Sequence, residues 1–105
     1  MIEATGISES DLKAVISVLQ KHPEIEEAIL FGSRAKGNFK NGSDLDIALK
    51  GKNISHSIIA DVSSELNEET LMPYHFDVLD YQKISNKDLA EHISRAGISF
   101  YRKKS

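Results

Sequence analysis

The segment that most constrains this chain runs between two apolar stretches, with the sequence GSRAKGNFKNGSDLD over residues 32–46. Gly32 and Ser33 come directly after the apolar run at residues 28–31, so a tight turn is expected at the end of a buried strand. Asp44 and Asp46 stand at the start of the next apolar run. The segment predicts a strand, a turn, a loop and a second strand that opens with two carboxylates.

The two aspartates are expected to project from the same side of the second strand. Residues two apart on a strand point the same way, with Cα atoms about 6.5 to 7 Å apart. Asp77 lies in a later apolar run, where Phe76 and Val78 are the residues expected to be buried. If that run pairs beside the second strand, Asp77 joins Asp44 and Asp46.

Three converging carboxylates repel one another unless cations neutralise them. Mg²⁺ prefers such oxygen ligands and keeps sites open for phosphate oxygens. Two metal ions about 3.5 to 4 Å apart could clamp the attacking and leaving oxygens of an in-line displacement. A simpler interpretation remains open, in which Asp44 caps a turn and Asp46 only faces solvent.

The Gly-Ser turn is a candidate phosphate site. Gly32 has no side chain and lets phosphate oxygens approach the backbone, while Ser33 offers a hydroxyl at a possible helix start. Arg34 adds positive charge beside them. The pattern of a P-loop does not occur. The alternative is an ordinary tight turn with a serine cap.

Apolar periodicity predicts a small α/β fold in one domain spanning residues 1–105. We expect a mixed sheet of about three strands with helices packed on one face. The predicted strands are 25–31, 45–50 and 74–81, and the predicted helices are 8–20, 54–68 and 85–96. Gly97 is expected to end the last helix in a left-handed conformation, and Arg102, Lys103 and Lys104 to form a polar tail.

Composition narrows the function classes. A net charge of −3 argues against strong unspecific binding to nucleic acid. The chain has no cysteine, which excludes a thiol nucleophile and a Cys-based zinc site. No signal peptide and no apolar run of about 20 residues is visible, so we expect a soluble, cytoplasmic protein with no membrane partner.

The combined pattern resembles the DNA polymerase beta-type nucleotidyltransferase superfamily, and within it the minimal nucleotidyltransferases. The resemblance rests on the spaced motif G-S-x-A-x-G, S-D-x-D and a later aspartate, formed here by Gly32, Ser33, Ala35, Gly37, Ser43, Asp44, Asp46 and Asp77. It covers nearly the whole chain in element order and implies the palm-like nucleotidyltransferase fold. Lys36 stands where the family often has arginine, which keeps the charge and loses the bidentate geometry.

The resemblance also implies a reaction and a partner. A hydroxyl would attack the α-phosphate of ATP, with AMP transferred and pyrophosphate released. Gly32, Ser33 and Arg34 would contact the nucleotide, and Asp44, Asp46 and Asp77 would hold Mg²⁺ and act in catalysis. Minimal nucleotidyltransferases commonly accompany a HEPN-domain toxin, so the implied acceptor is a tyrosine of that toxin and the implied assembly is a hetero-oligomer.

Two other functions stay open at this point. The chain could be a non-catalytic antitoxin that binds a nucleotide and neutralises its partner by masking a surface. It could also be a nucleotide sensor without turnover. His75 would share a strand face with Asp77, where it either touches a phosphate, tunes Asp77 or is an ordinary strand residue.

Overall fold

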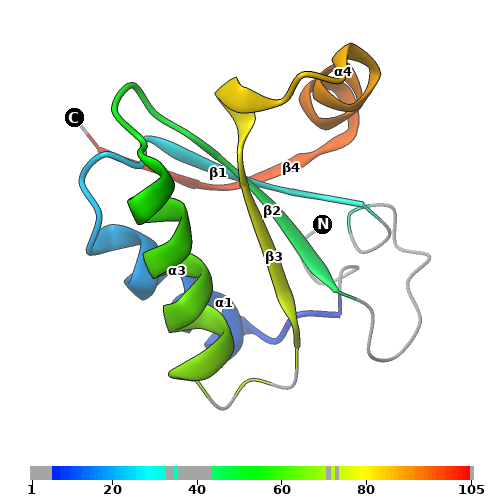
Figure 1. The fold of residues 1–105 in the computed structure, drawn as a ribbon. Coiled ribbons are helices and arrows are strands. Elements are labelled where there is room, and N and C mark those ends of the chain that lie inside the picture. Colours follow the sequence, from blue (N-terminus) through cyan, green and yellow to red (C-terminus); the bar gives the residue numbers. More distant parts are fainter. Residues whose placement is uncertain (1–5, 33–34, 36–43, 71, 73, 105) are drawn as a thin grey trace.

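A mixed β-sheet carries the fold, in the strand order β3-β2-β1-β4 (Figure 1). The computed structural model describes residues 6–32, 35, 44–70, 72 and 74–104, and within them the sheet has four strands. The strands are β1 (Glu27–Phe31), β2 (Leu45–Lys50), β3 (Phe76–Asp80) and β4 (Ile98–Arg102). β1 is antiparallel to both β2 and β4, and β2 is parallel to β3. The α/β class is confirmed.

Side-chain caps start each of the described helices, which are α1 (Glu9–Gln20), α3 (His56–Glu68) and α4 (Lys87–Ala96). Ser8 accepts a hydrogen bond from the Asp11 N–H at 3.1 Å, and Ser55 caps α3 in the same way. Asn86 caps α4. A single turn of 3₁₀ helix, η2 (Tyr81–Lys83), joins β3 to the loop before α4. None of the described helices combines the length and the apolar character needed to cross a membrane.

Helices cover both faces of the sheet. α1 and α3 pack on one face, over a core that includes Leu30, Ile47 and Phe76. α4 lies on the opposite face, where Ile93 packs with Ile29 and Phe31. The sequence predicted helices on one face of the sheet. α1 and α3 agree with that prediction, whereas α4 lies on the other face. β1 needs cover on both sides because residues 28–31 are all buried.

The chain ends in a strand where a polar tail was expected. β4 pairs with β1, and its residues Ile98, Phe100 and Tyr101 pack against the core under α1 and α3. Arg102, assigned to the tail, forms an ion pair with Glu27 at 3.2 Å. The expectation of a tail beginning at Arg102 is therefore wrong, because that residue ends a paired strand.

Gly97 joins α4 directly to β4 in an extended conformation (φ −71°, ψ 157°), so the left-handed end predicted for this helix is wrong. Glycine is needed here for close packing instead. A Cβ atom at this position would overlap Cγ2 of Ile29 and the carbonyl oxygen of Ile93.

The substitution Gly97→Ala should therefore lower the free energy of unfolding by about 1–3 kcal/mol, the usual cost of overpacking. Urea unfolding measures it, with Ser94→Ala on the exposed side of α4 as the control. Equal stability of the two variants would show that the backbone around Gly97 can move apart at no cost.

Candidate active site

The parallel pairing of β2 and β3 brings two of the predicted acids side by side. Asp46 and Asp77 are direct partners in the register of these strands. Asp44 lies two residues before Asp46, immediately before β2. Leu45 precedes Asp46 and Phe76 precedes Asp77. The side chains of both residues point to the opposite face and are buried in the core. The condition for bringing Asp77 to the other acids, a third strand paired beside the second, is therefore met.

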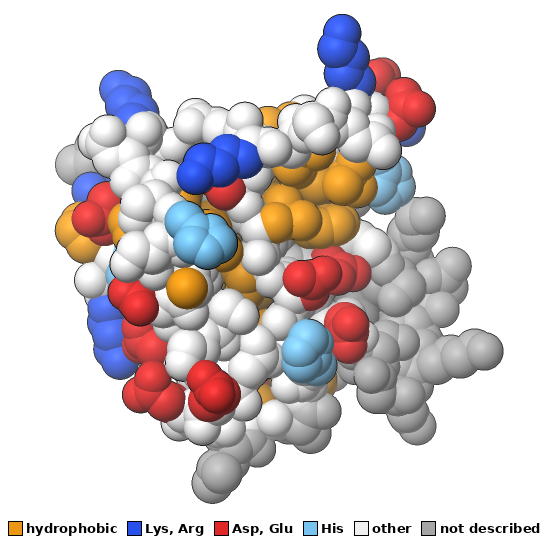
Figure 2. Space-filling model, viewed as in Figure 1, with side chains coloured by type: hydrophobic (Ala, Val, Ile, Leu, Met, Phe, Trp, Pro, Cys, Tyr) orange, Lys and Arg blue, Asp and Glu red, His pale blue; other side chains and the backbone are white. Residues whose placement is uncertain are grey.

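The three acids lie on the face of the sheet that carries α4. Figure 2 shows acidic side chains gathered beside a patch of hydrophobic side chains below α4. The apolar residues of this face include the buried Phe31 and Ala48 and the partly buried Leu79, Ile84 and Leu89. A ligand at the acids would therefore meet an apolar surface on one side.

The surroundings of Asp46 disfavour ionisation of its carboxyl group. Burial raises the pKa of its carboxyl, and the charges of Asp77 and Asp44 raise the pKa further. Asp44 and Asp77 are exposed. The repulsion that the sequence predicts between these carboxylates is therefore present in the fold.

Asp44 has a second neighbour that the spacing of the acids did not identify. Its Oδ1 lies 3.6 Å from Nδ1 of His75, and both side chains are more than half exposed. His75 occupies the position before β3, next to Asp44, because the Leu45 N–H donates to the His75 carbonyl oxygen at 2.9 Å. The sequence left three roles open for His75: a phosphate contact, an influence on Asp77, and an ordinary strand position. The contact with Asp44 is one that none of these roles included.

The backbone of Gly32 packs against Asp46, the most buried of the three candidate acids. It adopts a positive φ of 82°, which favours glycine, at the end of β1. A Cβ atom there would overlap Oδ2 of Asp46 and lie 3.3 Å from its Cγ. The turn and the acids thus form one continuous surface. Ser33 and Arg34, the other predicted nucleotide contacts, lie outside the described residues, as do Lys36, Gly37 and Ser43 of the motif.

The donor set suits magnesium in its chemistry. Asp46 is a partly buried carboxylate whose pKa is raised by burial and by the charges of Asp77 and Asp44, so a bound divalent cation would remove the repulsion between these carboxylates. As the side chains stand, no three acids or histidines among the described residues are close enough together to hold a metal ion. Asp44 would have to turn from His75 toward Asp46 and Asp77 to complete the set.

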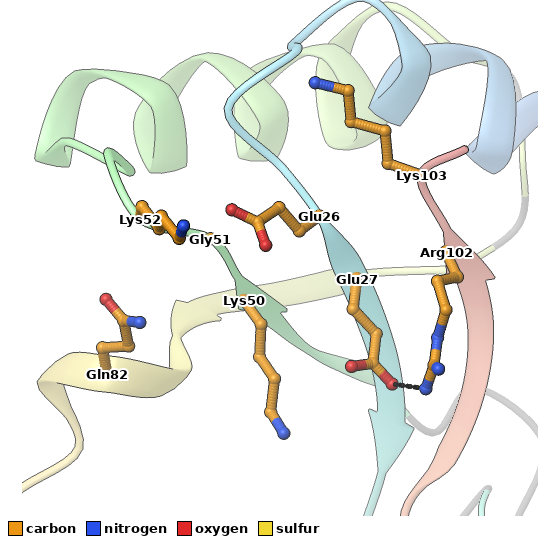
Figure 3. A pocket seen from close by; sticks show the side chains of 8 residues that line it. All are labelled: Glu26, Glu27, Lys50, Gly51, Lys52, Gln82, Arg102 and Lys103. Carbon is orange, nitrogen blue, oxygen red and sulfur yellow. Dashed lines mark hydrogen bonds and ion pairs between the residues drawn. The ribbon is translucent and has the colours of Figure 1, made fainter. Parts of the chain in front are cut away.

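A cavity lies at the other end of the sheet, away from the acids. Its volume is about 580 Å³, and Figure 3 shows its lining: Glu26, Glu27, Lys50, Gly51, Lys52, Gln82, Arg102 and Lys103. Several of these charges are already engaged. Arg102 pairs with Glu27, and the Lys50 ammonium lies 4.4 Å from the ring centroid of Tyr81. The acids make the better candidate site, because this cavity contains none of the predicted functional residues.

Comparison with known proteins identifies the family of the chain. The sequence matches the family described as Polymerase beta, Nucleotidyltransferase over residues 13–105. A Haemophilus influenzae protein named "Probable protein adenylyltransferase MntA" is 30% identical over 98 residues, which cover 93% of this chain and 85% of the relative.

Solved structures share the fold. A toxin–antitoxin complex with AMP-PNP matches with a TM-score of 0.74 and 19% identity, over 90% of this chain and 75% of that one. A tri-AMPylated Shewanella oneidensis HEPN toxin in complex with MNT antitoxin matches with a TM-score of 0.67 and 16% identity, over 98% of this chain and 74% of that one. The resemblance seen in the sequence is confirmed: this chain belongs to the polymerase beta nucleotidyltransferase family.

Proposed function

We propose that this protein is an Mg²⁺-dependent adenylyltransferase that transfers AMP from ATP to a tyrosine hydroxyl of a HEPN-domain partner and so acts as its antitoxin. The observation that carries the proposal is the pairing of Asp46 with Asp77 on adjacent strands. Asp44 lies two residues before Asp46, on the same face. Three carboxylates therefore lie on one side of the sheet, next to Gly32, which has no side chain to block the approach of a ligand.

Each acid has a role in the proposed reaction. Asp44, Asp46 and Asp77 would hold Mg²⁺, which when bound neutralises phosphate charge and makes the α-phosphorus more electrophilic. The acceptor oxygen attacks the α-phosphorus, its new P–O bond forms, and the bond to the bridging oxygen of the β-phosphate breaks. Pyrophosphate leaves with the electron pair, and the hydroxyl proton passes to Asp77, the exposed acid of the strand pair.

The nucleotide would be bound at the end of β1. The backbone of Gly32 already lies against Asp46, so phosphates placed on this turn would lie beside the acids. Ser33 and Arg34 follow in the sequence and would supply a hydroxyl and a positive charge. Because ATP is the proposed donor, the cytoplasm is the proposed location of the reaction.

The choice of AMP and of the acceptor is supported by the relatives. The Haemophilus influenzae relative carries the name of a protein adenylyltransferase. One solved relative has AMP-PNP, and another is an antitoxin in complex with an AMPylated HEPN toxin. A hetero-oligomer with such a toxin would present the acceptor hydroxyl to Asp77.

A second candidate function is neutralisation by masking, in which the chain binds its toxin without modifying it. The observation that favours it is the contact of Asp44 with His75, which leaves the three acids apart as they stand. Masking depends on surface contact alone, so it predicts that the acids can be removed without loss of neutralisation.

The double substitution Asp44→Ala and Asp46→Ala separates the two functions. We expect transfer of label from [α-³²P]ATP to the partner to fall by at least about 100-fold, and neutralisation of the toxin in cells to be lost with it. Asp61→Ala is the control, because Asp61 is an exposed acid on α3, which packs on the opposite face of the sheet. Full neutralisation by the double variant would establish masking instead.

A further inference from the structure

The edge strand that carries Asp77 is held in place by one side chain from α3. Asn67 accepts a hydrogen bond from the Phe76 N–H at 2.7 Å and donates one to the Phe76 carbonyl oxygen at 2.9 Å. Its amide thereby forms the two hydrogen bonds that a neighbouring strand would form at this residue. α3 lies beside β3, as Figure 1 shows.

These bonds lie on the free edge of the sheet. The carbonyl of His75 faces β2, where it accepts from the Leu45 N–H, so the backbone groups of the next residue point to the outer side of β3. Asn67 satisfies both the N–H and the carbonyl oxygen of Phe76 on this outer side. Asn67 replaces the missing neighbour at the residue next to Asp77.

The rest of this position is equally constrained. The Phe76 side chain is 1% exposed within the core, and its ring packs edge-on against Tyr74 at 6.1 Å. Asn67 also donates to Ser63 Oγ at 3.3 Å, one turn earlier on α3, which orients the amide. Phe76 is therefore fixed by its side chain from the core and by its backbone from α3.

We propose that Asn67 is a positioning residue for the third acid of the site: it fixes the backbone of Phe76 and thereby holds Asp77 opposite Asp46. The proposal rests on the proposed function, because it concerns the metal site of that reaction. Asn67 lies on α3, which packs on the face of the sheet opposite the acids. It acts through the strand, and a loss of Asn67 lets the first residues of β3 move away from β2 and separates the two carboxylates.

The test is Asn67→Ala, with Thr70→Val as the matched control. Thr70 donates to the Leu66 carbonyl oxygen at 2.7 Å at the same end of α3, so the control removes a side-chain hydrogen bond without touching β3. We expect Asn67→Ala to raise the Mg²⁺ concentration for half-maximal transfer about tenfold, as loss of an outer-shell partner does, and to change the KM for ATP at saturating Mg²⁺ by less than about twofold. Mn²⁺ binding followed by electron paramagnetic resonance, without ATP, should weaken by a similar factor.

Ser63→Ala is the second variant, for use if Asn67→Ala does not fold. It leaves both bonds to Phe76 possible and removes only the contact that orients the amide, so we expect a smaller change in the same direction. If Asn67→Ala, or Ser63→Ala in its place, lowers only the melting temperature, as Thr70→Val does, and leaves Mn²⁺ binding unchanged, the positioning role is overturned. A wild-type chain that neither binds Mn²⁺ nor transfers AMP overturns the proposed function instead.

Discussion

Asp46→Asn should reduce the rate of AMP transfer by about 10²–10³, the usual loss when one group that stabilises the developing charge is removed. Asparagine keeps the size of the side chain and removes the charge that would hold the cation. Asp46 is the central acid, since it faces Asp77 across the strands and lies two residues after Asp44. Initial rates with labelled ATP and the partner protein measure the effect, and Asp61→Asn on α3 is the control.

The same substitution should stabilise the metal-free protein at neutral pH. Burial and the charges of Asp77 and Asp44 raise the pKa of Asp46 above the ordinary value of 3.8, so the folded state disfavours the ionised form. Stability therefore falls as the pH rises from 3.8 through the raised folded-state pKa, and the full penalty persists above it. Asparagine cannot ionise and avoids this penalty.

Thermal unfolding at a series of pH values without metal tests this sign. The melting temperatures of Asp46→Asn and of the wild type should be equal well below pH 3.8 and diverge above it, with the variant more stable. A variant that is less stable at neutral pH would mean that the carboxylate makes a stabilising contact. That result, together with undiminished transfer, would remove Asp46 from the site.

The acids could be placed from the sequence because their positions depend on local alternation. β2 has the predicted bounds, with Leu45, Ile47 and Leu49 buried on one face and Asp46 on the other. The pairing of Asp46 with Asp77 follows once β3 lies beside β2, because a buried Phe76 leaves only one face for its neighbour. The positions of the acids therefore follow from the alternation within each strand and from the pairing of β2 with β3.

The features that the sequence did not reveal depend on contacts between distant residues. The paired residues of β4 and β1 are far apart in the sequence, as Leu30 and Ile98 are, and an irregularity between Ala28 and Ile29 leaves Phe100 without a partner in the strand register. Phe100 and Tyr101 consequently pack on the same face, which breaks the alternation that identifies a strand. The bonds of Asn67 to Phe76 are also invisible in the sequence, since an asparagine near the end of a helix is normally exposed.

Gly32→Ala should damage both the fold and the site. Alanine at a φ of +82° costs about 1–2 kcal/mol of unfolding free energy, because its Cβ approaches the following carbonyl oxygen. The new methyl group would also overlap the Asp46 carboxylate and push it from its place opposite Asp77. We therefore expect AMP transfer to fall about 100-fold, in addition to the loss of stability.

Gly6→Ala separates these two effects. Gly6 has a φ of +78° and is exposed, so alanine there carries the backbone cost without contact with the acids, and transfer should stay at the wild-type rate. In an Asp46→Ala background the overlap disappears, and Gly32→Ala should then cost only about as much unfolding free energy as Gly6→Ala, as urea titration can measure. The contact between the turn and the central acid would be refuted by additive costs, with Gly32→Ala equally destabilising in both backgrounds.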